Sequence, residues 1–306
     1  MKILLLGRNG QVGQALEKIL APRGELLALT RQQLDLADSN AIRAIIQKFR
    51  PEVIVNAAAY TAVDKAESEP ELALAINGTA PGIMAEEAAR LNALLVHYST
   101  DYVFDGTKSA PYTELDIPHP QNIYGHSKLA GEQQICTRAS RYLIFRTSWV
   151  YDQQGKNFLT TIKRLGGQRH ELTIVNDQLG APTWSGEIAR TTSNAIEKYL
   201  THTSSQQING IYHLTAQGQT SWFDFARAAE KYGLFSSLAH PPTLRAISSA
   251  EFATTAKRPM YSVLSNAKLL AQFGLQLPDW EISLRKCLES TESEIKIKDI
   301  SKNSKS

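Results

Sequence analysis

A phenol and an amine lie four residues apart in the segment Tyr124-Gly125-His126-Ser127-Lys128, which follows Asn122 closely. Asn is a common first residue of helices. If a helix begins there, Tyr124 and Lys128 share one face, with about 5–6 Å between their Cβ atoms. Free tyrosine has a pKa of about 10, and a nearby positive charge lowers it. A tyrosine tuned in this way can exchange a proton with a hydroxyl or carbonyl oxygen. The pattern also arises by chance in many surface helices, so its meaning depends on the rest of the chain.

A second pattern, at the N-terminus, indicates nucleotide binding. A short apolar run over residues 2–6 leads into the glycine-rich segment 7–13, and a helical pattern continues to residue 20. A strand, a glycine-rich turn and a helix in this order let a pyrophosphate approach the backbone, where free N–H groups can bind it. The spacing is G-x-x-G-x-x-G. Its position directly after the first strand favours nucleotide binding over a merely structural turn.

The end of the second predicted strand, residues 26–30, bears on the choice of cofactor. Folds that prefer NAD usually have Asp or Glu here to bind the ribose 2′-hydroxyl. This chain has Thr30 and Arg31 instead. A guanidinium suits a 2′-phosphate, so we expect NADPH to be preferred, with NADH possible. The alternative is that Arg31 is a solvated loop residue.

Length and composition exclude several classes of protein. The 306 residues are 42% hydrophobic and 21% charged, which is typical of a soluble globular protein of one or two domains. The net charge of +3 is too small to indicate nucleic-acid binding. No run approaches the roughly 18 apolar residues of a membrane helix, and the N-terminus reads as a strand rather than a signal peptide. Cys136 and Cys287 fit neither a disulfide framework nor a metal site. We therefore expect a cytoplasmic protein with a small-molecule partner, and neither nucleic acid nor membrane.

Strand and helix patterns alternate over the first 150 residues. Buried strands are predicted at 53–58, 94–99 and 142–146, and helices at 40–49, about 71–91 and from about 122. This alternation predicts an α/β fold with a doubly wound parallel sheet of the Rossmann type, covered on both faces. Ligands bind such sheets at the carboxyl ends of the strands. Polar or glycine-rich segments follow four strands there, at 7–13, 57–61, 99–101 and 147–149.

Beyond residue 150 the alternation becomes irregular, which predicts a second, smaller, mixed α/β domain that binds the substrate. Short strands are expected at 172–175, 211–215 and 244–247, and helices at 157–165, 185–200, 222–232 and 266–273. We assign residues 1–150 with about 185–220 to the dinucleotide-binding domain, so that 211–215 returns to the main sheet. Residues 151–184 and about 221–288 form the substrate domain. The polar segment 289–306 is predicted to be a disordered tail.

Several segments together resemble a known family. The Tyr-x-x-x-Lys motif resembles that of the extended short-chain dehydrogenase/reductase superfamily. The segments Thr100–Phe104 and Phe145–Tyr151 resemble, more specifically, segments of the dTDP-4-dehydrorhamnose reductase family. The resemblance covers about residues 1–285. Its segments are 7–13, 55–67, 98–104, 124–132, 145–151, 176–183 and 258–262.

The resemblance implies an NAD(P)H-dependent oxidoreductase that reduces the C4 keto group of dTDP-4-dehydro-L-rhamnose to dTDP-L-rhamnose. This nucleotide sugar serves the biosynthesis of lipopolysaccharide or other cell-surface polysaccharide. Tyr124 would protonate the developing alkoxide. Lys128 would hold the nicotinamide ribose and lower the tyrosine pKa. Thr100 would hydrogen-bond the sugar oxygen, because a hydroxyl both donates and accepts.

The resemblance also implies binding residues. The cofactor-binding residues would be Gly7, Gly10, Gln11, Val12, Gly13, Thr30, Arg31, Asp35, Leu36, Ala59, Tyr60, Thr61, Tyr98, Tyr124 and Lys128. The substrate-binding residues would be Thr100, Asp101, Trp149 and Arg258, the last as a diphosphate clamp. The alternatives are a purely structural hydrogen bond for Thr100, core packing for Trp149 and a surface ion pair for Arg258.

Three other polar residues receive structural interpretations. Asp64 and Glu67 are expected in a solvated loop and helix start rather than as a catalytic pair. His97, next to a strand end, is expected to be packed rather than catalytic.

One departure from the family concerns metal. Some members are thought to dimerise through a metal held by glutamates, one of them on the first helix. The matching position here is Ala15. Glu187 remains, but one carboxylate per subunit provides few ligands for a metal ion. We therefore expect no catalytic metal and no metal-bridged dimer; the protein would be a monomer or a homodimer.

Two other functions remain open. The first is another nucleotide-sugar epimerase or dehydratase of the same fold. Dehydratases of this group typically have Asp-Glu after the threonine, whereas this chain has Thr100-Asp101-Tyr102, which favours net reduction. The second is a non-catalytic nucleotide-binding regulatory subunit, and the complete set of Tyr124, Lys128 and Thr100 argues against it.

Overall fold

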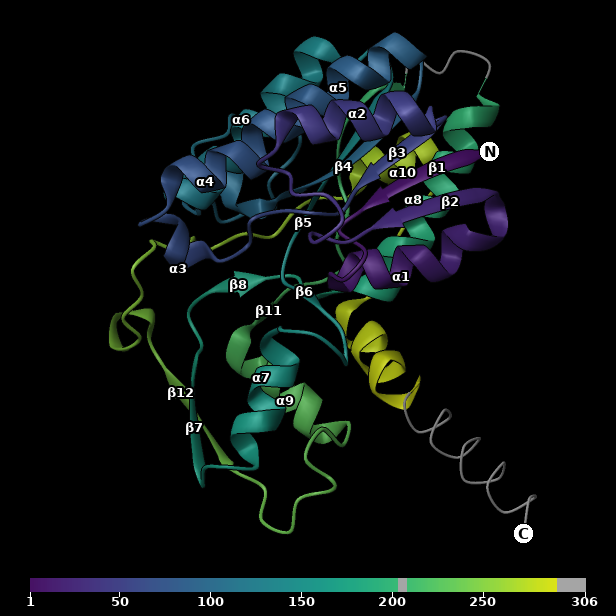
Figure 1. Ribbon diagram of the computed structural model, residues 1–306. Coiled ribbons are helices and arrows are strands. Elements are labelled where there is room, and N and C mark those ends of the chain that lie inside the picture. The colour runs from purple at the N-terminus through teal and green to yellow at the C-terminus, as the bar shows by residue number, and fades with distance from the viewer. Residues whose placement is uncertain (203–207, 291–306) are drawn as a thin grey trace, which may run out of the picture.

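Six parallel strands form the central sheet of the computed structural model, which describes residues 1–202 and 208–290 (Figure 1). Their order is β10-β5-β4-β3-β1-β2, and every neighbouring pair is parallel. The strands are β1 (Lys2–Leu6), β2 (Glu25–Leu29), β3 (Val53–Asn56), β4 (Leu94–Thr100), β5 (Tyr142–Thr147) and β10 (Gly210–His213). The predicted parallel α/β sheet is confirmed, and the segment near 211–215 does return to it. From residue 291 onward, the predicted tail lies outside the described residues.

Helices cover both faces of this sheet, which is why the central strands are apolar on both sides. Every residue of β3 and β4 is buried. Helices α1 (Gln11–Leu20), α8 (Ser185–Thr201) and α10 (Ala267–Phe273) pack on one face. Helices α2 (Ser39–Phe49), α5 (Ala80–Leu91) and α6 (Ile123–Arg138) pack on the other, and these lie along the upper side of Figure 1.

The helix predicted at about 71–91 is present but contains a π-helical turn. It comprises α4 (Pro70–Leu74), the π turn η2 (Ala75–Thr79) and α5. Pro81 lacks the N–H that would bond the Asn77 carbonyl in a regular α-helix. Helix α6 uses this irregularity, because a Cβ on Gly131 would lie 2.1 Å from that same carbonyl oxygen. The glycine therefore permits α6 to approach the π turn closely.

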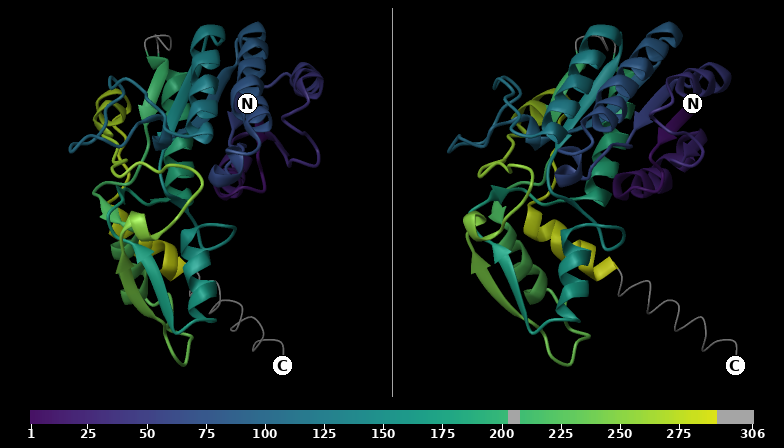
Figure 2. Two further views of the ribbon diagram at one scale, coloured as in Figure 1. Left: turned by 90° about the vertical axis from the view of Figure 1, so that its left-hand side faces the viewer. Right: turned by 60° about the vertical axis from the view of Figure 1, so that its left-hand side comes forward.

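A smaller part of the chain lies below the central sheet in Figure 1 and in both views of Figure 2. Its core joins α7 (Phe158–Gly166) and α9 (Trp222–Lys231) to the parallel pair β7 (Glu171–Val175) and β12 (Thr243–Ile247), with a further helical segment at 280–290. Two short pairs complete it: β6 (Val150–Tyr151) with β9 (Thr183–Trp184), and β8 (Leu179–Gly180) with β11 (Thr220–Ser221). The remaining elements are short: η1 (Ala21–Arg23), α3 (Val63–Ala66), η3 (Asp101–Val103) and η5 (Ser249–Glu251).

The strand order places a ligand crevice at a defined edge of the sheet. The chain reverses its direction of travel between β1 and β3, and open α/β sheets bind ligands at the carboxyl ends of strands at such a point. Gly7 adopts φ +83° there, a conformation that favours glycine. A Cβ on Gly13 would lie 2.0 Å from the Gly7 carbonyl oxygen, so the turn also needs glycine at its second end.

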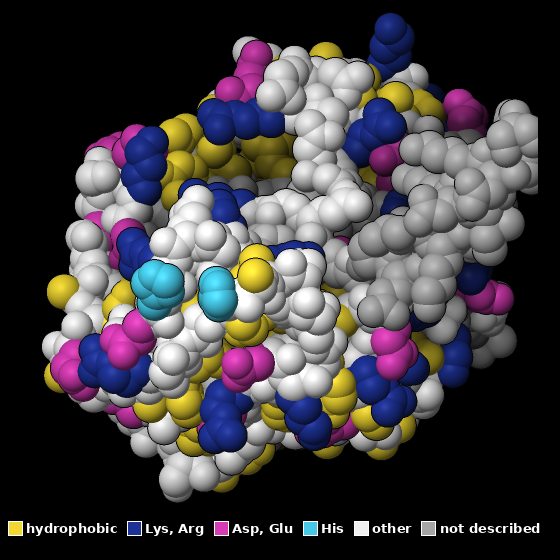
Figure 3. Space-filling view, turned by 90° about the horizontal axis from the view of Figure 1, so that it is seen from below, with side chains coloured by type: hydrophobic (Ala, Val, Ile, Leu, Met, Phe, Trp, Pro, Cys, Tyr) yellow, Lys and Arg dark blue, Asp and Glu magenta, His cyan; other side chains and the backbone are white. Residues whose placement is uncertain are grey.

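Charge is mixed on the lower face of the molecule (Figure 3). Seen from below in Figure 3, Lys and Arg side chains stand among Asp and Glu side chains rather than in one basic patch. Within residues 1–202 and 208–290, no helix combines the length and apolar character needed to cross a membrane.

Candidate active site

Helix α6, which carries the tyrosine and the lysine, begins where the sequence predicts. Asn122 is its N-cap, and its Oδ1 accepts a hydrogen bond from the Gly125 N–H at 2.8 Å. Glu67 accepts another from the Ile123 N–H at 2.8 Å. Glu67 was expected in a solvated loop and helix start rather than in a catalytic pair. It is half-buried, and its carboxylate binds a backbone donor at the start of α6 that has no intrahelical partner.

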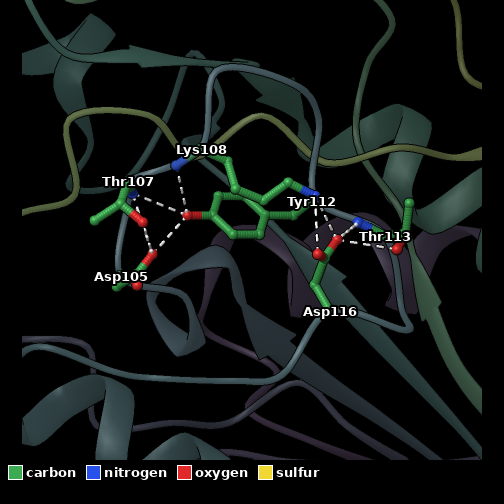
Figure 4. Close-up of polar contacts among 6 residues, drawn as sticks. All are labelled: Asp105, Thr107, Lys108, Tyr112, Thr113 and Asp116. Atoms are coloured by element: carbon green, nitrogen blue, oxygen red, sulfur yellow. Dashed lines mark hydrogen bonds and ion pairs between the residues drawn. The ribbon is translucent and has the colours of Figure 1, made fainter.

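A network of polar contacts holds the loop that leads into α6 (Figure 4). The Tyr112 hydroxyl donates to Asp105 Oδ1 at 2.7 Å and accepts from the Thr107 N–H at 3.0 Å. The hydrogen bond from Tyr112 contributes most to lowering the pKa of Asp105, to about 2. Lys108 Nζ binds the Asp116 carboxylate at 2.8 Å. Residues 105–116 therefore approach α6 along a fixed path.

Tyr124 is partly buried beside Thr100, and its pKa is raised. Burial raises the pKa of Tyr124 to about 12, although a hydrogen bond with Thr100 opposes this shift. The direction is opposite to the one expected from the sequence, because burial disfavours the phenolate more than any neighbour favours it. The ring of Tyr102 packs edge-on against Tyr124, with 5.7 Å between centroids. Tyr124 therefore carries its proton at neutral pH.

The amine of Lys128 points away from the bulk solvent. Lys128 is 2% exposed, and its Nζ donates to the Tyr98 carbonyl oxygen at 2.6 Å. It also lies 3.1 Å from His97 Nε2. Burial lowers the pKa of Lys128 to about 8, whereas the carboxylate of Glu132 opposes this shift. His97 is buried, as predicted, and it contacts the lysine directly.

A buried ion pair fixes α6 against β5 one turn beyond the lysine. Glu132 and Arg146 meet through two hydrogen bonds of 2.6 and 2.9 Å, and both side chains are 2% exposed. The guanidinium also lies over the Phe104 ring, 5.1 Å from its centroid. Removing one partner of such a pair leaves a buried charge and typically costs about 3–5 kcal/mol. The pair therefore holds the register between the helix and the sheet.

Thr100 and Asp101 follow one another at the carboxyl end of β4. Thr100 Oγ1 donates to Asp101 Oδ1 at 3.0 Å and accepts from the Tyr102 N–H at 3.2 Å. Asp101 is 2% exposed. Burial raises the pKa of Asp101 to about 6, and hydrogen bonds from Ser262 and Thr100 oppose this shift. The Thr100 hydroxyl thus lies between the phenol of Tyr124 and the carboxyl of Asp101, which is mostly protonated below pH 6.

A crevice of about 500 Å³ opens along the carboxyl ends of β1, β2, β3 and β4. It collects nearly all of the predicted cofactor-binding residues; only Gly13 is not on its wall, because it lies behind the turn against Gly7. Those on the wall are Gly7, Gly10, Gln11, Val12, Thr30, Arg31, Asp35, Leu36, Ala59, Tyr60, Thr61, Tyr98, Tyr124 and Lys128.

The predicted substrate residues lie outside this crevice wall. Trp149 stacks on Trp222 with 3.5 Å between ring centroids and 6° between planes, and its φ is +47°. A Cβ on Gly180 would lie 2.4 Å from the Trp149 ring, so the stack depends on that glycine. Arg258 pairs with Asp64 at 3.0 Å. Trp149 and Arg258 thus have different partners, an indole ring for the one and a carboxylate for the other.

The crevice also has walls that the sequence analysis did not assign. Asn157 Nδ2 donates to Gln11 Oε1 at 2.7 Å, which joins the N-cap of α7 to the glycine-rich turn. This contact brings Gly155 and Lys156 to the crevice, where no motif indicated them. Four further wall residues belong to the strand-end segments 57–61, 99–101 and 147–149 that were predicted to lie at the ligand-binding edge: Ala57, Ala58, Ser99 and Thr147.

Metal ligands were not expected in this chain. Across the two described ranges, no group of three or more His, Cys, Asp or Glu side chains could hold a metal ion. Glu187 pairs with Arg190 at 2.7 Å. The expectation of no catalytic metal and no metal-bridged dimer remains a prediction.

Known proteins resemble this chain over almost its whole length. Residues 1–293 match the family model described as RmlD substrate binding domain. A dTDP-4-dehydrorhamnose reductase of Burkholderia thailandensis is 44% identical over 292 residues, covering 94% of this chain and 98% of that protein. One from Escherichia coli K12 is 42% identical over 296 residues, covering 94% and 97%. The crystal structure of dTDP-4-dehydrorhamnose reductase from Bacillus anthracis in complex with NADP superposes with a TM-score of 0.85 at 36% identity, covering 95% of this chain and all of that one.

The raised pKa of Asp101 predicts a pH-dependent contribution to stability. An aspartate titrates near 3.8 when unfolded and near 6 here, so the folded state binds more protons between these values. Protonation of Asp101 therefore stabilises the folded state. This stabilisation is fully present below about pH 4 and is lost as pH rises through about 6. Asp101→Asn removes this titration. Relative to that variant, the wild-type free energy of unfolding should fall by about 2–3 kcal/mol between pH 4 and pH 7.

Urea unfolding of both proteins at the two pH values measures this difference. Asp105→Asn is the matched control, because the pKa of Asp105 is lowered to about 2 and its titration lies below this window, so its contribution should hardly change between pH 4 and pH 7. Parallel pH dependence of the wild type and Asp101→Asn would contradict the assignment.

Proposed function

The chain belongs to the dTDP-4-dehydrorhamnose reductase family, and from this membership we propose that it reduces dTDP-4-dehydro-L-rhamnose to dTDP-L-rhamnose with NADPH. The observation that carries the proposal is the meeting of Tyr124, Thr100 and Lys128 beside a glycine-lined crevice. These are the groups that a carbonyl reduction needs: a proton donor, a hydroxyl that orients the carbonyl and a cation at the cofactor.

The crevice suits a dinucleotide phosphate. No described side chain caps the N-terminus of α1, and its first turn contains no acidic residue. The first N–H groups of this helix are therefore available to an anion, which the helix dipole also favours. Gly10, Gln11 and Val12 would bind the pyrophosphate, and Arg31 would bind a 2′-phosphate. Asp35 and Leu36 would lie by the adenine, and the segment 59–61 would flank the cofactor.

The chemistry divides between the cofactor and the chain. Bound reduced nicotinamide would supply a hydride to C4 of the keto sugar, which leaves an alkoxide to be protonated. Tyr124 would give its phenolic proton to that oxygen, and its raised pKa keeps the proton available at neutral pH. Thr100 would hydrogen-bond the same oxygen and orient it. Lys128 would bind the ribose hydroxyls of the nicotinamide half.

The substrate contacts follow from the same site. Asp101 lies next to Thr100 and would bind a sugar hydroxyl. Trp149, stacked on Trp222, would form one wall of the sugar pocket. Arg258 would bind the diphosphate, although it would then share its guanidinium with Asp64, its partner in the structure.

The wider assignments accompany this reaction. We propose residues 1–150 with about 185–220 as the dinucleotide-binding domain, and 151–184 with about 221–288 as the nucleotide-sugar domain. We also propose a cytoplasmic location, a monomer or homodimer, and a role in rhamnose-containing surface polysaccharide.

The proposed reaction predicts one NADPH consumed per sugar reduced. Purified protein should oxidise NADPH in stoichiometric amounts with dTDP-4-dehydro-L-rhamnose, and much more slowly with UDP- or GDP-linked 4-keto sugars. Absorbance of the reduced cofactor, with chromatography of the sugar product, measures both. Conversion without net NADPH consumption would indicate an epimerase or dehydratase. Nucleotide binding without any turnover would indicate a regulatory subunit.

Tyr124→Phe removes the proposed proton donor and little else. We expect kcat to fall by about a hundred- to ten-thousandfold, while NADPH binding measured by fluorescence stays largely intact. Tyr142→Phe, which removes a phenolic hydroxyl at the amino end of β5, is the matched control and should keep wild-type turnover. Near-normal kcat in Tyr124→Phe would remove this residue as the donor.

Arg31→Asp tests the basis of cofactor choice. Losing a charge-assisted contact to the 2′-phosphate should cost about 1.5–3 kcal/mol, which is roughly ten- to hundredfold in kcat/KM for NADPH. The value for NADH serves as the internal control and should change far less. A wild-type preference for NADH, or an unchanged ratio in the variant, would contradict the assignment.

A further inference from the structure

Two buried residues that the proposed reaction does not use form a polar chain behind Lys128. Asn56 ends β3, and its Nδ2 lies 3.0 Å from His97 Nδ1. His97 lies on β4, and its Nε2 is 3.1 Å from Lys128 Nζ. Asn56 and His97 are each 1% exposed. The polar atoms of these two side chains must therefore find their hydrogen-bond partners within the protein.

The backbone determines which way the Asn56 amide faces. Asn56 Oδ1 accepts from the Ala58 N–H at 3.2 Å, which turns the amide nitrogen toward His97. An amide nitrogen only donates, so His97 Nδ1 must accept. Burial holds the pKa of His97 well below its usual range, so the ring is neutral and has one proton. That proton is then on Nε2, which faces the lysine.

This assignment affects the charge of Lys128. An ammonium has donors only, so it opposes the N–H of His97 Nε2. A neutral amine accepts from that N–H and still donates to the Tyr98 carbonyl oxygen. The ammonium form fits only if the His97 proton moves to Nδ1 and the Asn56 amide turns over. The turned amide would then present its nitrogen to the Ala58 N–H and lose that hydrogen bond.

We propose that Asn56 and His97 are positioning residues that favour the amine form of Lys128, and that the orientation of the Asn56 amide couples this preference to the crevice loop at Ala58. Ala58 lies on the wall of the nucleotide crevice. A nucleotide whose ribose hydroxyls favour the ammonium would therefore also alter the hydrogen bonding of the loop beneath it.

Other ionisable groups near Lys128 also influence whether its side chain is an amine or an ammonium. On its own helix, Glu132 favours the ammonium, but Arg146 from β5 binds this carboxylate through two hydrogen bonds. Tyr124 on the same helix is protonated at neutral pH, and Asp101 follows β4 beyond Thr100. His97 and Asn56 are the groups that oppose the ammonium by hydrogen-bond geometry rather than by charge.

The tautomer of His97 tests the proposal directly and without turnover. Nitrogen-15 NMR of the full-length protein labelled in histidine distinguishes Nε2–H from Nδ1–H. The chain has seven histidines, so the signals of His97 are assigned by their loss in His97→Gln. We expect Nε2–H in the free wild type at pH 8.5. Nδ1–H under these conditions would overturn the proposal.

Asn56→Asp should reverse the tautomer. A carboxylate at this position can accept both from the Ala58 N–H and from a His97 Nδ1–H. His97 Nε2 would then accept from the ammonium of Lys128. We expect Nδ1–H in this variant, and the wild-type tautomer there would overturn the proposal.

The same variant should shift the pH profile of the reaction, and this part rests on the proposed function. If the ammonium of Lys128 binds the ribose, kcat/KM falls as pH rises through its pKa. Raising that pKa moves the alkaline limb of the profile upward. We expect a shift of about one pH unit or more for Asn56→Asp.

Asn77→Asp is the matched control for the profile. Asn77 is also 1% exposed, but its side chain bonds Tyr60 and Ser127 rather than His97. Equal shifts in the two variants, or none in Asn56→Asp, would overturn the proposal. If the substrate panel shows no reduction at all, the proposed function fails, and the NMR result still decides the hydrogen-bond chain.

Discussion

The register of α6 against the ends of β4 and β5 controls the geometry of the whole site. Asn122 determines where the helix begins, and the buried pair of Glu132 and Arg146 ties its middle to the sheet. Tyr124 and Lys128 lie between these two anchors, one turn apart. A shift of one residue would turn the phenol away from Thr100 and the amine away from the Tyr98 carbonyl. A loose anchor would thus affect both groups at once.

Burial is the second influence, and it acts on Tyr124, Asp101 and Lys128 in the same sense. It raises the pKa of Tyr124 and Asp101 and lowers that of Lys128, so each group is displaced toward its neutral form. The charges of a bound nucleotide would then exert a large effect, because the surroundings screen them poorly.

Contacts between distant segments join the smaller part of the molecule to the crevice. Asn157, which caps α7, bonds Gln11 in the glycine-rich turn, and Arg258 bonds Asp64 after β3. Both contacts connect a region proposed for the sugar to one proposed for the cofactor. Occupation of one region therefore has a physical route to the other through single hydrogen bonds.

Local sequence patterns were sufficient to predict the elements and most of the crevice. The apolar runs, the glycine turn after residue 6 and the Asn122 N-cap are local features, and the conformations they favour depend on neighbours a few residues away. The parallel sheet followed from their alternation. Residues at strand ends, such as Thr100 and the segment 59–61, could be placed near one another because parallel strands end at one edge.

The tertiary structure alone decided which polar groups meet. Glu67 bonds the start of α6 across 56 positions, and Asn56 meets His97 across 41. The hydrophobic pattern of the sequence does not indicate such pairs, because they depend on how separate elements pack. The same limit explains the pKa of Tyr124: spacing put an amine within one turn, but only packing decided that the amine would face Tyr98 and that burial would outweigh its charge. The sequence therefore determined which groups are available, and the fold determined their partners and protonation states.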